Sequence, residues 1–467
     1  MLVAIDGFAG SGKSTIAKML ASKIGFFYLD TGATYRALGL AVAKKTGKRE
    51  NFSLEEILKV VEEVELKVEY IGGDFRIYLN GEDVTEVIRT EKVGKYASLV
   101  ASFPQIKEKL FEFQRNLVNK GNAVVEGRDA GLYVFPNADL KIFLTATPEV
   151  RAKRRLKELK ERGKTDVSYE EILKAIIERD KRDQTRKDYP FKPAPDAVVI
   201  DTSEKTIDQV FQEVWELVEP YLNLFITGVG SGLGLALAKE FIERGYTVFA
   251  ISRKEPNELK GNPKFVFTAC DLSNLEEVRD KVRQLLERVK GNLPWVILNA
   301  GILGELKEMR LTPLKEFQRI LDVNLWSNKL LLDLLWDLQK EGKLKVGQIV
   351  AISSGAAVNC NKGWNAYSLS KAGLNCMVKL YHWEFENSHL ISLAPGLITT
   401  PMLEKVLKIA EEDRFPSVKR IKRAPKHTPE SAAKMLLQVF PSLVKFPSGS
   451  FIDVRKEFGE IYNSCLP

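Results

Sequence analysis

Two glycine-rich loops of different pattern occur in this chain. The first runs from Gly7 to Ser14 (GFAGSGKS) and the second from Thr227 to Gly234 (TGVGSGLG). The first has the G-x-x-x-x-G-K-[ST] spacing that folds around the phosphates of a mononucleotide. The second is typical of loops that hold the pyrophosphate of a dinucleotide. Each loop follows an apolar run and precedes a helical pattern, so the chain contains the beginnings of two nucleotide-binding domains.

The length of the chain sets how many domains to expect. Its 467 residues exceed the ~250–300 at which a single hydrophobic core stops growing, so two or more domains are expected. Apolar residues make up 45% of the chain and charged residues 28%, as in ordinary globular proteins. No apolar run reaches the ~18 residues of a membrane span, and residues 1–6 have no basic segment before them. We therefore expect a cytoplasmic protein with no membrane partner.

The chain carries a net positive charge, which would point to nucleic acid only if it were gathered on one face. The formal net charge is +8, and the densest basic stretch, residues 151–155 (RAKRR), is followed by further lysines interleaved with Glu158 and Glu161. This stretch fits either a solvated helix or a lid that faces phosphate groups. Small anionic nucleotides account for the charge as well as nucleic acid does, and we expect no nucleic-acid partner.

Cysteine and histidine are too few and too scattered to predict a metal site of their own. The chain has three histidines, and no two of its four cysteines form a C-x-x-C pair. We expect reduced thiols. The cysteines are Cys270, Cys360, Cys376 and Cys465.

The first half alternates strand and helix patterns, with one exception. Residues 2–6 predict a buried strand, and residues 14–24 predict a helix that follows Lys13. From about residue 64 to 84, apolar and polar residues alternate on both sides of Gly72-Gly73-Asp74. This pattern predicts a small antiparallel hairpin made of residues 66–70 and 75–79.

A boundary is expected at Pro220, which follows an amphipathic helix predicted over residues 207–218. A new strand starts almost at once, so the predicted domains are residues 1–221 and 222–467 with no flexible linker between them. The second half alternates strand and helix regularly, which predicts a doubly wound parallel sheet covered on both faces. Its strands are expected at 222–227, 246–251, 265–268, 295–298, 348–352 and 390–394.

The first loop predicts phosphoryl transfer. Its glycines allow backbone N–H groups to turn around a phosphate. Lys13 would reach the transferred group, and Ser14 would coordinate the Mg²⁺ that accompanies ATP. Arginines and aspartates recur together further on and suit a reaction whose catalysis is mostly positioning and charge stabilisation. They are Arg36, Arg128, Arg179 and Arg186, with Asp30, Asp129 and Asp183.

Further motifs carry a resemblance to a known family. Residues 1–221 resemble the bacterial cytidylate kinases along their whole length. The motifs are YLDTGATYR (28–36), LNGEDVT (79–85), EGRD (126–129) and ERDKRDQTR (178–186). The resemblance implies the α/β fold of a P-loop nucleoside monophosphate kinase, with a small antiparallel insert at about 64–90 and a lid at about 150–190. It also implies transfer of phosphate from ATP to CMP or dCMP, giving CDP or dCDP.

The same resemblance implies roles for individual residues. Catalysis would rest on Lys13, Arg128 and Arg186. Arg36, Arg128 and Arg186 would hold the acceptor phosphate, Arg179 and Asp183 would face the sugar, and Ser98 and Asp129 would read the cytosine. The implied ATP set is Gly7, Gly10, Ser11, Gly12, Lys13, Ser14, Thr15, Arg151 and Arg155, and the CMP set also includes Thr31, Tyr35 and Lys107.

One position departs from the family pattern. After Phe103-Pro104 the family usually has an arginine that contacts the base, and this chain has Lys107. Lysine lacks the planar fork that recognises a partner with two parallel hydrogen bonds. The hypothesis is a looser selectivity for cytosine.

The second loop predicts a dinucleotide site that prefers NADPH. After the next predicted strand the chain reads Ile251-Ser252-Arg253-Lys254, where an NAD enzyme would place an acidic residue. A basic residue suits the 2′-phosphate of NADP. Arg253 is also compatible with a solvated surface position, but the missing acid favours NADPH.

A Y-x-x-x-K pattern, Tyr367 to Lys371, places two polar side chains on one helix face. A nearby ammonium lowers the pKa of a phenol, so Tyr367 would exchange a proton with a carbonyl oxygen near neutral pH. Ser354 lies at the end of a predicted strand, at the edge where parallel sheets bind ligands.

These features in this order resemble a short-chain dehydrogenase/reductase, from residue 222 to about 455. The resemblance implies a Rossmann-type fold and a catalytic set of Asn324, Ser354, Tyr367 and Lys371. Ser354 would hold the substrate oxygen, Tyr367 would donate the proton, and Asn324 would support a proton-relay water. The implied NADP set is Gly228, Ser231, Gly232, Leu233, Gly234, Arg253, Asp271, Asn299, Ala300, Gly301, Tyr367, Lys371 and Thr400.

Two details refine this resemblance. The family's usual Asn-Asn-Ala-Gly begins with Leu298 here, which should affect structural support more than chemistry. The segments 353–357 (SSGAA) and 362–364 (KGW) resemble benzil- and sepiapterin-type reductases, which implies reduction of a ketone or an α-dicarbonyl.

The leading interpretation is therefore a bifunctional enzyme acting on small molecules. An alternative keeps the kinase active and makes the second half a non-catalytic dinucleotide-binding or dimerisation module. The second resemblance also implies a homodimer or homotetramer formed through that half.

Overall fold

The computed structural model describes residues 1–48, 50–161, 168–409 and 412–467. Of the predicted lid at about 150–190, residues 162–167 lie outside the described residues. Within the described ranges, no helix is long and apolar enough to span a membrane.

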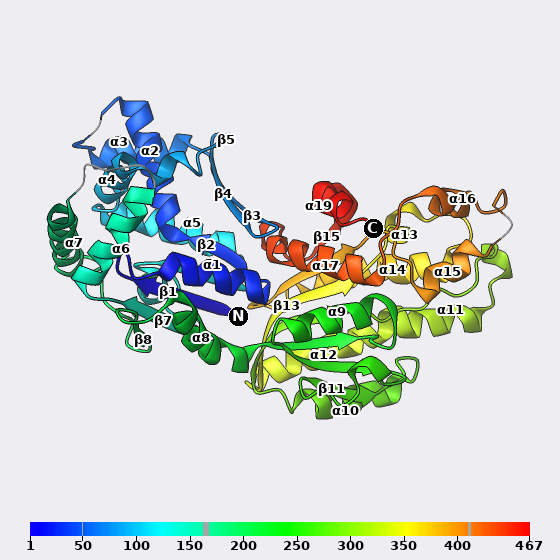
Figure 1. Ribbon diagram of the computed structural model, residues 1–467. Coiled ribbons are helices and arrows are strands. Elements are labelled where there is room, and N and C mark those ends of the chain that lie inside the picture. Colours follow the sequence, from blue (N-terminus) through cyan, green and yellow to red (C-terminus); the bar gives the residue numbers. More distant parts are fainter. Residues whose placement is uncertain (49, 162–167, 410–411) are drawn as a thin grey trace. The chain divides into compact units, whose positions relative to one another are not determined.

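The described chain forms two compact units (Figure 1). The N-terminal unit comprises residues 2–118 and 123–218. The C-terminal unit comprises residues 219–467 together with Met1 and residues 119–122.

The N-terminal unit is built on a parallel sheet whose order, among the described residues, is β2-β6-β1-β7-β8. The central strand β1 is the buried apolar run that ends at the first glycine-rich loop. Its neighbours β6 and β7 are buried along most of their length, because helices cover both faces of such a sheet. The strands are β1 (Leu2–Gly7), β2 (Phe27–Asp30), β6 (Ala123–Gly127), β7 (Leu140–Thr145) and β8 (Val198–Asp201).

A separate small antiparallel sheet confirms the predicted hairpin. It consists of β3 (Leu66–Ile71), β4 (Asp74–Leu79) and the short β5 (Glu82–Asp83). Gly72 and Gly73 join β3 to β4 with positive φ angles of 60° and 91°. Two consecutive positive φ angles suit the right-handed twist of a two-residue hairpin loop, and glycine adopts them without strain.

Helices position most of the predicted kinase residues. Helix α1 starts at Lys13, directly after Gly12 in the left-handed conformation. Asp30 caps α2, because its side chain accepts a hydrogen bond from the Ala33 N–H. The helices are α1 (Lys13–Ile24), α2 (Thr31–Thr46), α3 (Leu54–Glu63), α4 (Glu91–Val100), α5 (Pro104–Val118), α6 (Pro148–Glu161), α7 (Tyr169–Gln184) and α8 (Ile207–Val218).

The C-terminal unit contains a parallel sheet of order β11-β10-β9-β12-β13-β14-β15 in its described part. The six predicted strands are all present, and a further strand, β15, extends the edge beside β14. β15 has only four residues, too few to show a periodicity in the sequence. The strands are β9 (Asn223–Thr227), β10 (Thr247–Ser252), β11 (Phe265–Ala269), β12 (Gly291–Leu298), β13 (Leu344–Ile352), β14 (His389–Ala394) and β15 (Ser450–Asp453).

The two faces of this sheet carry different cores. On one face Val296 belongs to an aliphatic cluster shared with helices α10, α12 and α14. On the other face the adjacent residue Trp295 packs against Phe440 and against Phe241 of α9, with ring centroids 5.3 and 6.4 Å away. Alternation along one strand thus buries both faces, which confirms the expected doubly wound architecture.

The remaining helices of this unit surround the sheet (Figure 1). They are α9 (Gly232–Glu243), α10 (Leu275–Leu286), α11 (Leu314–Leu321), α12 (Ser327–Lys340), α13 (Ala356–Asn359), α14 (Asn365–Tyr381), α15 (Pro401–Leu407), α16 (Pro416–Arg423), α17 (Pro429–Val439), α18 (Val454–Glu457) and α19 (Gly459–Ser464).

The strand order reverses between β9 and β12, where a parallel sheet opens a crevice at its carboxyl edge. The second glycine-rich loop is packed tightly there. A Cβ on Gly228 would lie 2.8 Å from the Ala300 Cα, and a Cβ on Gly234 would lie 2.2 Å from the Gly228 carbonyl oxygen. Any larger residue at either position would have to push backbone aside.

We expect Gly234→Ala to destabilise the C-terminal unit by about 1–3 kcal/mol, because the new methyl group meets backbone that cannot move freely. Gly459→Ala is the matched control, since a Cβ at Gly459 meets no atom within 4 Å. Urea titration with hydrogen exchange measured on peptides of this unit compares the two variants. Equal stability of the two would contradict the tight packing of the loop.

Two candidate active sites

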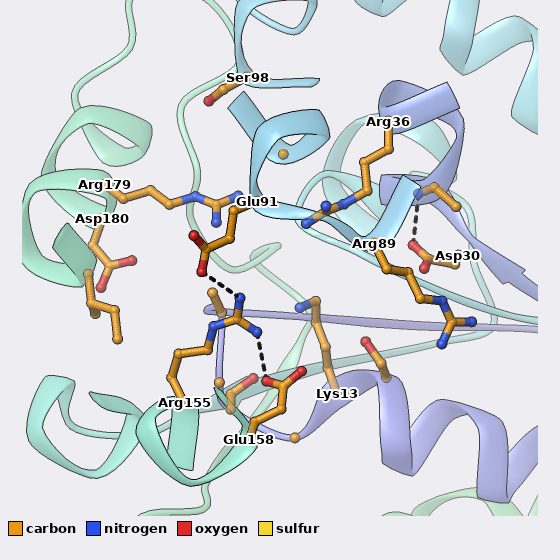
Figure 2. A pocket seen from close by; sticks show the side chains of 18 of the residues that line it. Lys13, Asp30, Arg36, Arg89, Glu91, Ser98, Arg155, Glu158, Arg179 and Asp180 are labelled. Atoms are coloured by element: carbon orange, nitrogen blue, oxygen red, sulfur yellow. Dashed lines mark hydrogen bonds and ion pairs between the residues drawn. The ribbon is translucent and has the colours of Figure 1, made fainter. Parts of the chain in front are cut away.

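The N-terminal unit contains a cavity of about 1730 Å³. Figure 2 shows Arg36, Arg155 and Arg179 turned from different elements toward the middle of the cavity, where the Lys13 side chain also points, whereas Arg89 points away from Lys13. Positive side chains therefore converge on the glycine-rich loop, as a phosphate site requires. The predicted residues that line the cavity are Gly10, Ser11, Gly12, Lys13, Ser14, Thr15, Arg36, Ser98, Lys107, Arg155, Arg179 and Arg186.

A buried carboxylate, Glu126 at the end of β6, organises the loop. It accepts hydrogen bonds from Ser14 Oγ at 2.6 Å and Tyr28 Oη at 3.3 Å, and Lys13 Nζ lies 3.9 Å away. Burial, reinforced by the charge of Asp30, raises the pKa of Glu126 to about 7. Burial also lowers the pKa of Lys13, and Glu126 opposes that shift.

The arginines of the predicted acceptor site share one buried aspartate. Asp183 forms ion pairs with Arg128, with Arg186 at 2.7 Å and with Arg179 at 3.9 Å. The Asp183 side chain is only 3% exposed. Burial and the neighbouring positive charges lower the pKa of Arg128 to about 9. The structure thus brings these four predicted residues together.

Several predicted residues lie behind the cavity wall instead of in it. The described residues that line the cavity do not include the following predicted ones: Gly7, Thr31, Tyr35, Arg128, Asp129, Arg151 and Asp183. Arg151 is buried and donates hydrogen bonds to the Ala146 carbonyl at 2.8 Å and to Asp180 at 2.6 Å. Its guanidinium also lies 4.8 Å from the centroid of the Phe8 ring. Its partners hold it away from the cavity, next to the loop.

Buried polar atoms without a hydrogen-bond partner indicate whether the region around the glycine-rich loop and the arginines fits an anionic ligand. Ser11 Oγ, Tyr35 Oη and Arg128 Nη2 are buried and make no hydrogen bond within the described part of the chain. Such atoms cost free energy unless a ligand or water satisfies them. Two hydroxyls and a guanidinium fit the phosphate oxygens of nucleotides.

In the C-terminal unit, a threonine hydroxyl ties the crevice together. Thr227 Oγ1 accepts hydrogen bonds from the N–H groups of Asn299 and Ala300, both at 3.0 Å. The Asn299 side chain donates to the carbonyls of Thr227 and Gly228, both at 3.1 Å. These bonds join the ends of β9 and β12. Leu298, which replaces the first Asn of the family pattern, is buried in β12.

The predicted cofactor contacts lie along the same edge. Arg253 is exposed just after β10, and Asp271 is exposed near the end of β11. Hydrogen bonds from Ser273 lower the pKa of Asp271, and the charge of Arg253 adds to that shift. Thr400 Cγ2 would lie 3.1 Å from a Cβ on Gly232, which places Thr400 beside the loop. Ser231, Leu233 and Gly301 occupy the loop, the start of α9 and the turn after β12.

Tyr367, Lys371 and Ser354 are brought together as predicted. Lys371 Nζ donates to the Ile352 carbonyl at 2.6 Å and lies 5.9 Å from the Tyr367 ring centroid. Burial raises the pKa of Tyr367, while a hydrogen bond with Ser354 opposes the shift. The expectation of a lowered Tyr367 pKa is therefore wrong, because burial outweighs the effect expected from the neighbouring ammonium. Burial lowers the pKa of Lys371 to about 8.

Asn324 lies close to these residues, but its side chain forms hydrogen bonds to the backbone of Ile302 and to the Ser370 hydroxyl. Its Oδ1 accepts from the Ile302 N–H, and its Nδ2 donates to the Ile302 carbonyl, both at 2.8 Å. Nδ2 also donates to Ser370 Oγ at 3.0 Å. Asn324 therefore fixes the turn after β12 to helix α14.

Glu126 and Arg89 were not predicted as site residues, and Arg154 was expected only as part of the basic run that would form a lid over ATP. Glu126 lies inside the EGRD motif, but the motif alone gave it no role. Arg89 lines the cavity, and Arg154 donates to the Thr202 carbonyl at 2.5 Å and Oγ1 at 3.0 Å. Thr202 in turn donates to the Ser11 carbonyl at 3.1 Å. The basic run at 151–155 was the available signal, but spacing alone does not tell which arginine faces the loop.

The geometry defines two classes of protein: a P-loop nucleotide kinase and a dinucleotide-binding α/β domain. Comparison with family models agrees. The cytidylate kinase model matches residues 3–220, and the short chain dehydrogenase model matches residues 223–410.

Individual relatives support the first match. A cytidylate kinase of Caldicellulosiruptor saccharolyticus is 47% identical over 215 residues, which are 46% of this chain and 94% of that protein. A cytidylate kinase of Thermotoga maritima is 46% identical over 221 residues, 47% of this chain and 98% of that protein.

Among solved structures, a 3-ketoacyl-(acyl-carrier-protein) reductase from Brucella melitensis, complexed with NADH, is 22% identical, covers 50% of this chain and 96% of that one, and has a TM-score of 0.42.

The chain belongs to the cytidylate kinase family through its first half, and a short-chain dehydrogenase domain is fused to that half. It thus joins a kinase and an oxidoreductase. The kinase implies ATP and a metal ion, and the second domain implies a nicotinamide dinucleotide.

We expect Asp183→Asn to destabilise the N-terminal unit by about 3 kcal/mol, because it leaves Arg128 largely buried without its carboxylate. The control Asp188→Asn changes an exposed aspartate five positions away and should stay within about 0.5 kcal/mol of wild type. Hydrogen exchange on peptides of this unit in increasing urea measures both. Similar small effects would show that Asp183 does not neutralise the arginines.

Proposed function

We propose that the chain is a bifunctional enzyme, which phosphorylates CMP and dCMP with ATP and reduces a ketone or an α-dicarbonyl with NADPH. The observation that supports the first activity is one cavity lined by both the glycine-rich loop and the acceptor-side residues Arg36, Ser98 and Arg186. Donor and acceptor nucleotides would meet there.

In the kinase reaction, this chain would contribute position and charge. The loop amides and Lys13 would hold the ATP phosphates, and Ser14 would contribute a hydroxyl to the Mg²⁺ that accompanies them. Arg36 and Arg186, which line the cavity, would hold the acceptor phosphate, and Arg128 would orient Arg186 from behind through the Asp183 that the two share. That phosphate is already an anion, so no side chain needs to remove a proton from it. Arg155, which lines the cavity, would face ATP, whereas Arg151 would position the loop from behind.

The observation that supports the second activity is the hydrogen bond between Ser354 and Tyr367 beside the Lys371 ammonium. NADPH, when bound in the crevice, would supply the hydride. Ser354 would then hold the carbonyl oxygen of the substrate, and Tyr367 would give it a proton. The raised pKa of Tyr367 leaves the proton on the phenol, and the neighbouring Lys371 ammonium would stabilise the phenolate that remains after the proton is given up.

The surroundings of Tyr367 support a substrate with apolar substituents. Tyr367 packs in a cluster with Leu303, Leu403, Val406, Phe415, Val418 and Ile421. The Trp364 ring lies 5.9 Å from the Tyr367 ring, and its N–H donates to Ser417 Oγ at 2.9 Å. An aromatic wall held in this way fits a flat carbonyl compound better than a highly charged one.

The two activities should be separable by single substitutions. We expect Tyr367→Phe to abolish NADPH oxidation with diketones and to leave phosphorylation of CMP intact, because only the proton donor is lost. Lys13→Ala should do the reverse. Both rates are measured on the same full-length preparations, so each variant serves as the folding control for the other.

Two outcomes would contradict this proposal. Absence of NADPH oxidation by the wild type with a panel of diketones favours the non-catalytic dinucleotide or dimerisation module. Equal oxidation by wild type and Tyr367→Phe would remove Tyr367 from the mechanism.

Arg253 should determine the choice of dinucleotide. We expect Arg253→Ala to lower kcat/KM for NADPH at least about tenfold, because a charge-assisted hydrogen bond to the 2′-phosphate is lost. The value for NADH should hardly change. Lys290→Ala is the matched control, because Lys290 is exposed before β12, at the opposite edge of the sheet. A parallel loss for NADH and NADPH would contradict the role of Arg253.

A further inference from the structure

An arginine outside the proposed catalytic set lies at the carboxyl edge of the second sheet, beside Ser354. Arg455 follows β15, which is two strands away from β13 in the sheet order. Neighbouring strands are about 4.8 Å apart, yet Arg455 Nη2 would lie 3.1 Å from a Cβ on Gly355, the residue after Ser354. The side chain therefore crosses the end of β14 and places its guanidinium over the edge where parallel sheets bind ligands.

A buried carboxylate holds this guanidinium in one orientation. Asp453, whose side chain is 9% exposed, accepts hydrogen bonds from Arg455 Nε at 3.0 Å and from Nη2 at 2.7 Å. It also accepts from the Arg455 backbone N–H at 3.1 Å. A guanidinium has five N–H donors, and within the described part of the chain this one forms only the two bonds to Asp453. The remaining donors, on Nη1 and Nη2, are available to a ligand.

A second donor approaches the same place. Asn359 Nδ2 would lie 3.5 Å from a Cβ on Gly355. The Asn359 side chain is exposed, and among the described residues it has no hydrogen-bond partner. Because glycine has no side chain, the space above Gly355 stays open between the two donors. We call this space, with Arg455 and Asn359 around it, the Gly355 subsite.

A carboxylate matches the donors of the Gly355 subsite. The Nη1–Nη2 edge of the planar Arg455 fork faces a different direction from the Nε–Nη2 edge that Asp453 occupies. A carboxylate accepts two parallel hydrogen bonds from such an edge, and charge-assisted bonds are about twice as strong as neutral ones. Both Asp453 oxygens accept from Arg455, so the aspartate orients the fork while the other edge stays available to an anion.

The apolar surroundings of Tyr367 suit the other end of the same substrate. Ala356 and Trp364 pack against the cluster that contains Tyr367. An apolar substituent of the carbonyl would lie there, and a carboxylate would lie at the Gly355 subsite. Consecutive Cα atoms are only about 3.8 Å apart, so the step from Ser354 to Gly355 is short. A carboxylate bonded directly to the reacting carbonyl carbon spans such a step and keeps the molecule flat.

We propose that the reductase site prefers 2-oxo acids, with the substrate carboxylate bound at the Gly355 subsite by Arg455 and Asn359. This inference rests on the proposed reductase function and names the substrate class within it, because a 2-oxo acid is an α-dicarbonyl whose second carbonyl belongs to a carboxylate. The carbonyl carbon receives a hydride from the dinucleotide, and its oxygen receives the Tyr367 proton. The products are a 2-hydroxy acid and the oxidised dinucleotide.

Phenylglyoxylate and its methyl ester test the role of the charge, because they share the aryl ketone and only the acid is an anion. The ester is the more reactive electrophile, so a preference for the acid has to come from the site. We expect full-length wild type with NADPH to show a kcat/KM at least about tenfold higher for the acid, and Arg455→Met to lower the acid:ester ratio at least about tenfold. Lys434→Met, which removes an exposed lysine of α17, should leave the ratio unchanged.

Two further variants probe the Gly355 subsite in other ways. Gly355→Ala keeps every charge but places a methyl group 3.1 Å from Arg455 Nη2, so it should lower the acid:ester ratio by filling the space. It also decides the assignment if Arg455→Met does not fold. Calorimetry with NADPH present measures binding without turnover. Tyr367→Phe should bind phenylglyoxylate at least about tenfold more tightly than the double variant Tyr367→Phe/Arg455→Met.

The outcomes separate the preference for 2-oxo acids from the proposed reductase function. Reduction of the ester with a kcat/KM equal to or above that of the acid overturns the preference and leaves the reductase intact. A preference for the acid that survives both Arg455→Met and Gly355→Ala overturns the assignment of the carboxylate to the Gly355 subsite. Absence of turnover with the acid, the ester and diketones alike overturns the reductase itself.

Discussion

Both candidate sites depend on one constraint, which is that parallel strands bring their carboxyl ends to the same edge of a sheet. In the N-terminal unit, β1 ends at Gly7 and its neighbour β6 ends at Gly127, so the glycine-rich loop and the Glu126-to-Asp129 segment face each other. In the C-terminal unit, β9 and β12 are neighbours in the same way, and hydrogen bonds from Asn299 and Ala300 to Thr227 lock their ends together. The distances between functional groups therefore follow from strand register, and the loops only have to supply the right side chains.

The N-terminal unit adds a second requirement, because its cavity concentrates positive charge that must be stable before any nucleotide binds. The structure meets it by pairing buried cations with carboxylates: Lys107 with Asp129 at 2.6 Å, Arg151 with Asp180 at 2.6 Å, and Arg128 and Arg186 with Asp183. A buried cation without a partner would cost several kcal/mol. The pairing keeps the arginines charged and oriented. The carboxylates already offset the free-energy cost of removing these cations from water, so phosphate binding does not have to. A strained or floppy cluster would lose affinity to reorganisation.

Much of the fold was predictable because buried strands and amphipathic helices follow periodicities that the sequence shows directly, including the hairpin around Gly72 and Gly73. Strand β15 was missed because four residues carry no period. The sequence predicted which residues belong to the kinase site, but not in which direction their side chains point. Arg151, Arg154 and Arg155 lie within one short basic run, yet Arg151 points to Asp180, Arg154 to Thr202 and Arg155 to Glu158. The pKa of Tyr367 was misjudged for a similar reason, since the Y-x-x-x-K spacing reveals the nearby ammonium but not the burial that outweighs it.

Specificity in both units then rests on very few side chains, because the backbone has already fixed where charge is needed. A loop of N–H groups binds the phosphates of any nucleotide, and a Ser–Tyr pair serves any carbonyl of suitable shape. Under the proposed function, the choice of dinucleotide would be decided by Arg253, which is exposed just after β10. Lys107, in contrast, is buried beside Asp129. The two differ in what a substitution costs. An exposed residue changes selectivity with little effect on folding, whereas a buried cation must keep its carboxylate satisfied. Lys107 shows this constraint: lysine keeps the ion pair with Asp129 but lacks the planar fork of an arginine, so the charge stays balanced while the capacity for two parallel hydrogen bonds is lost.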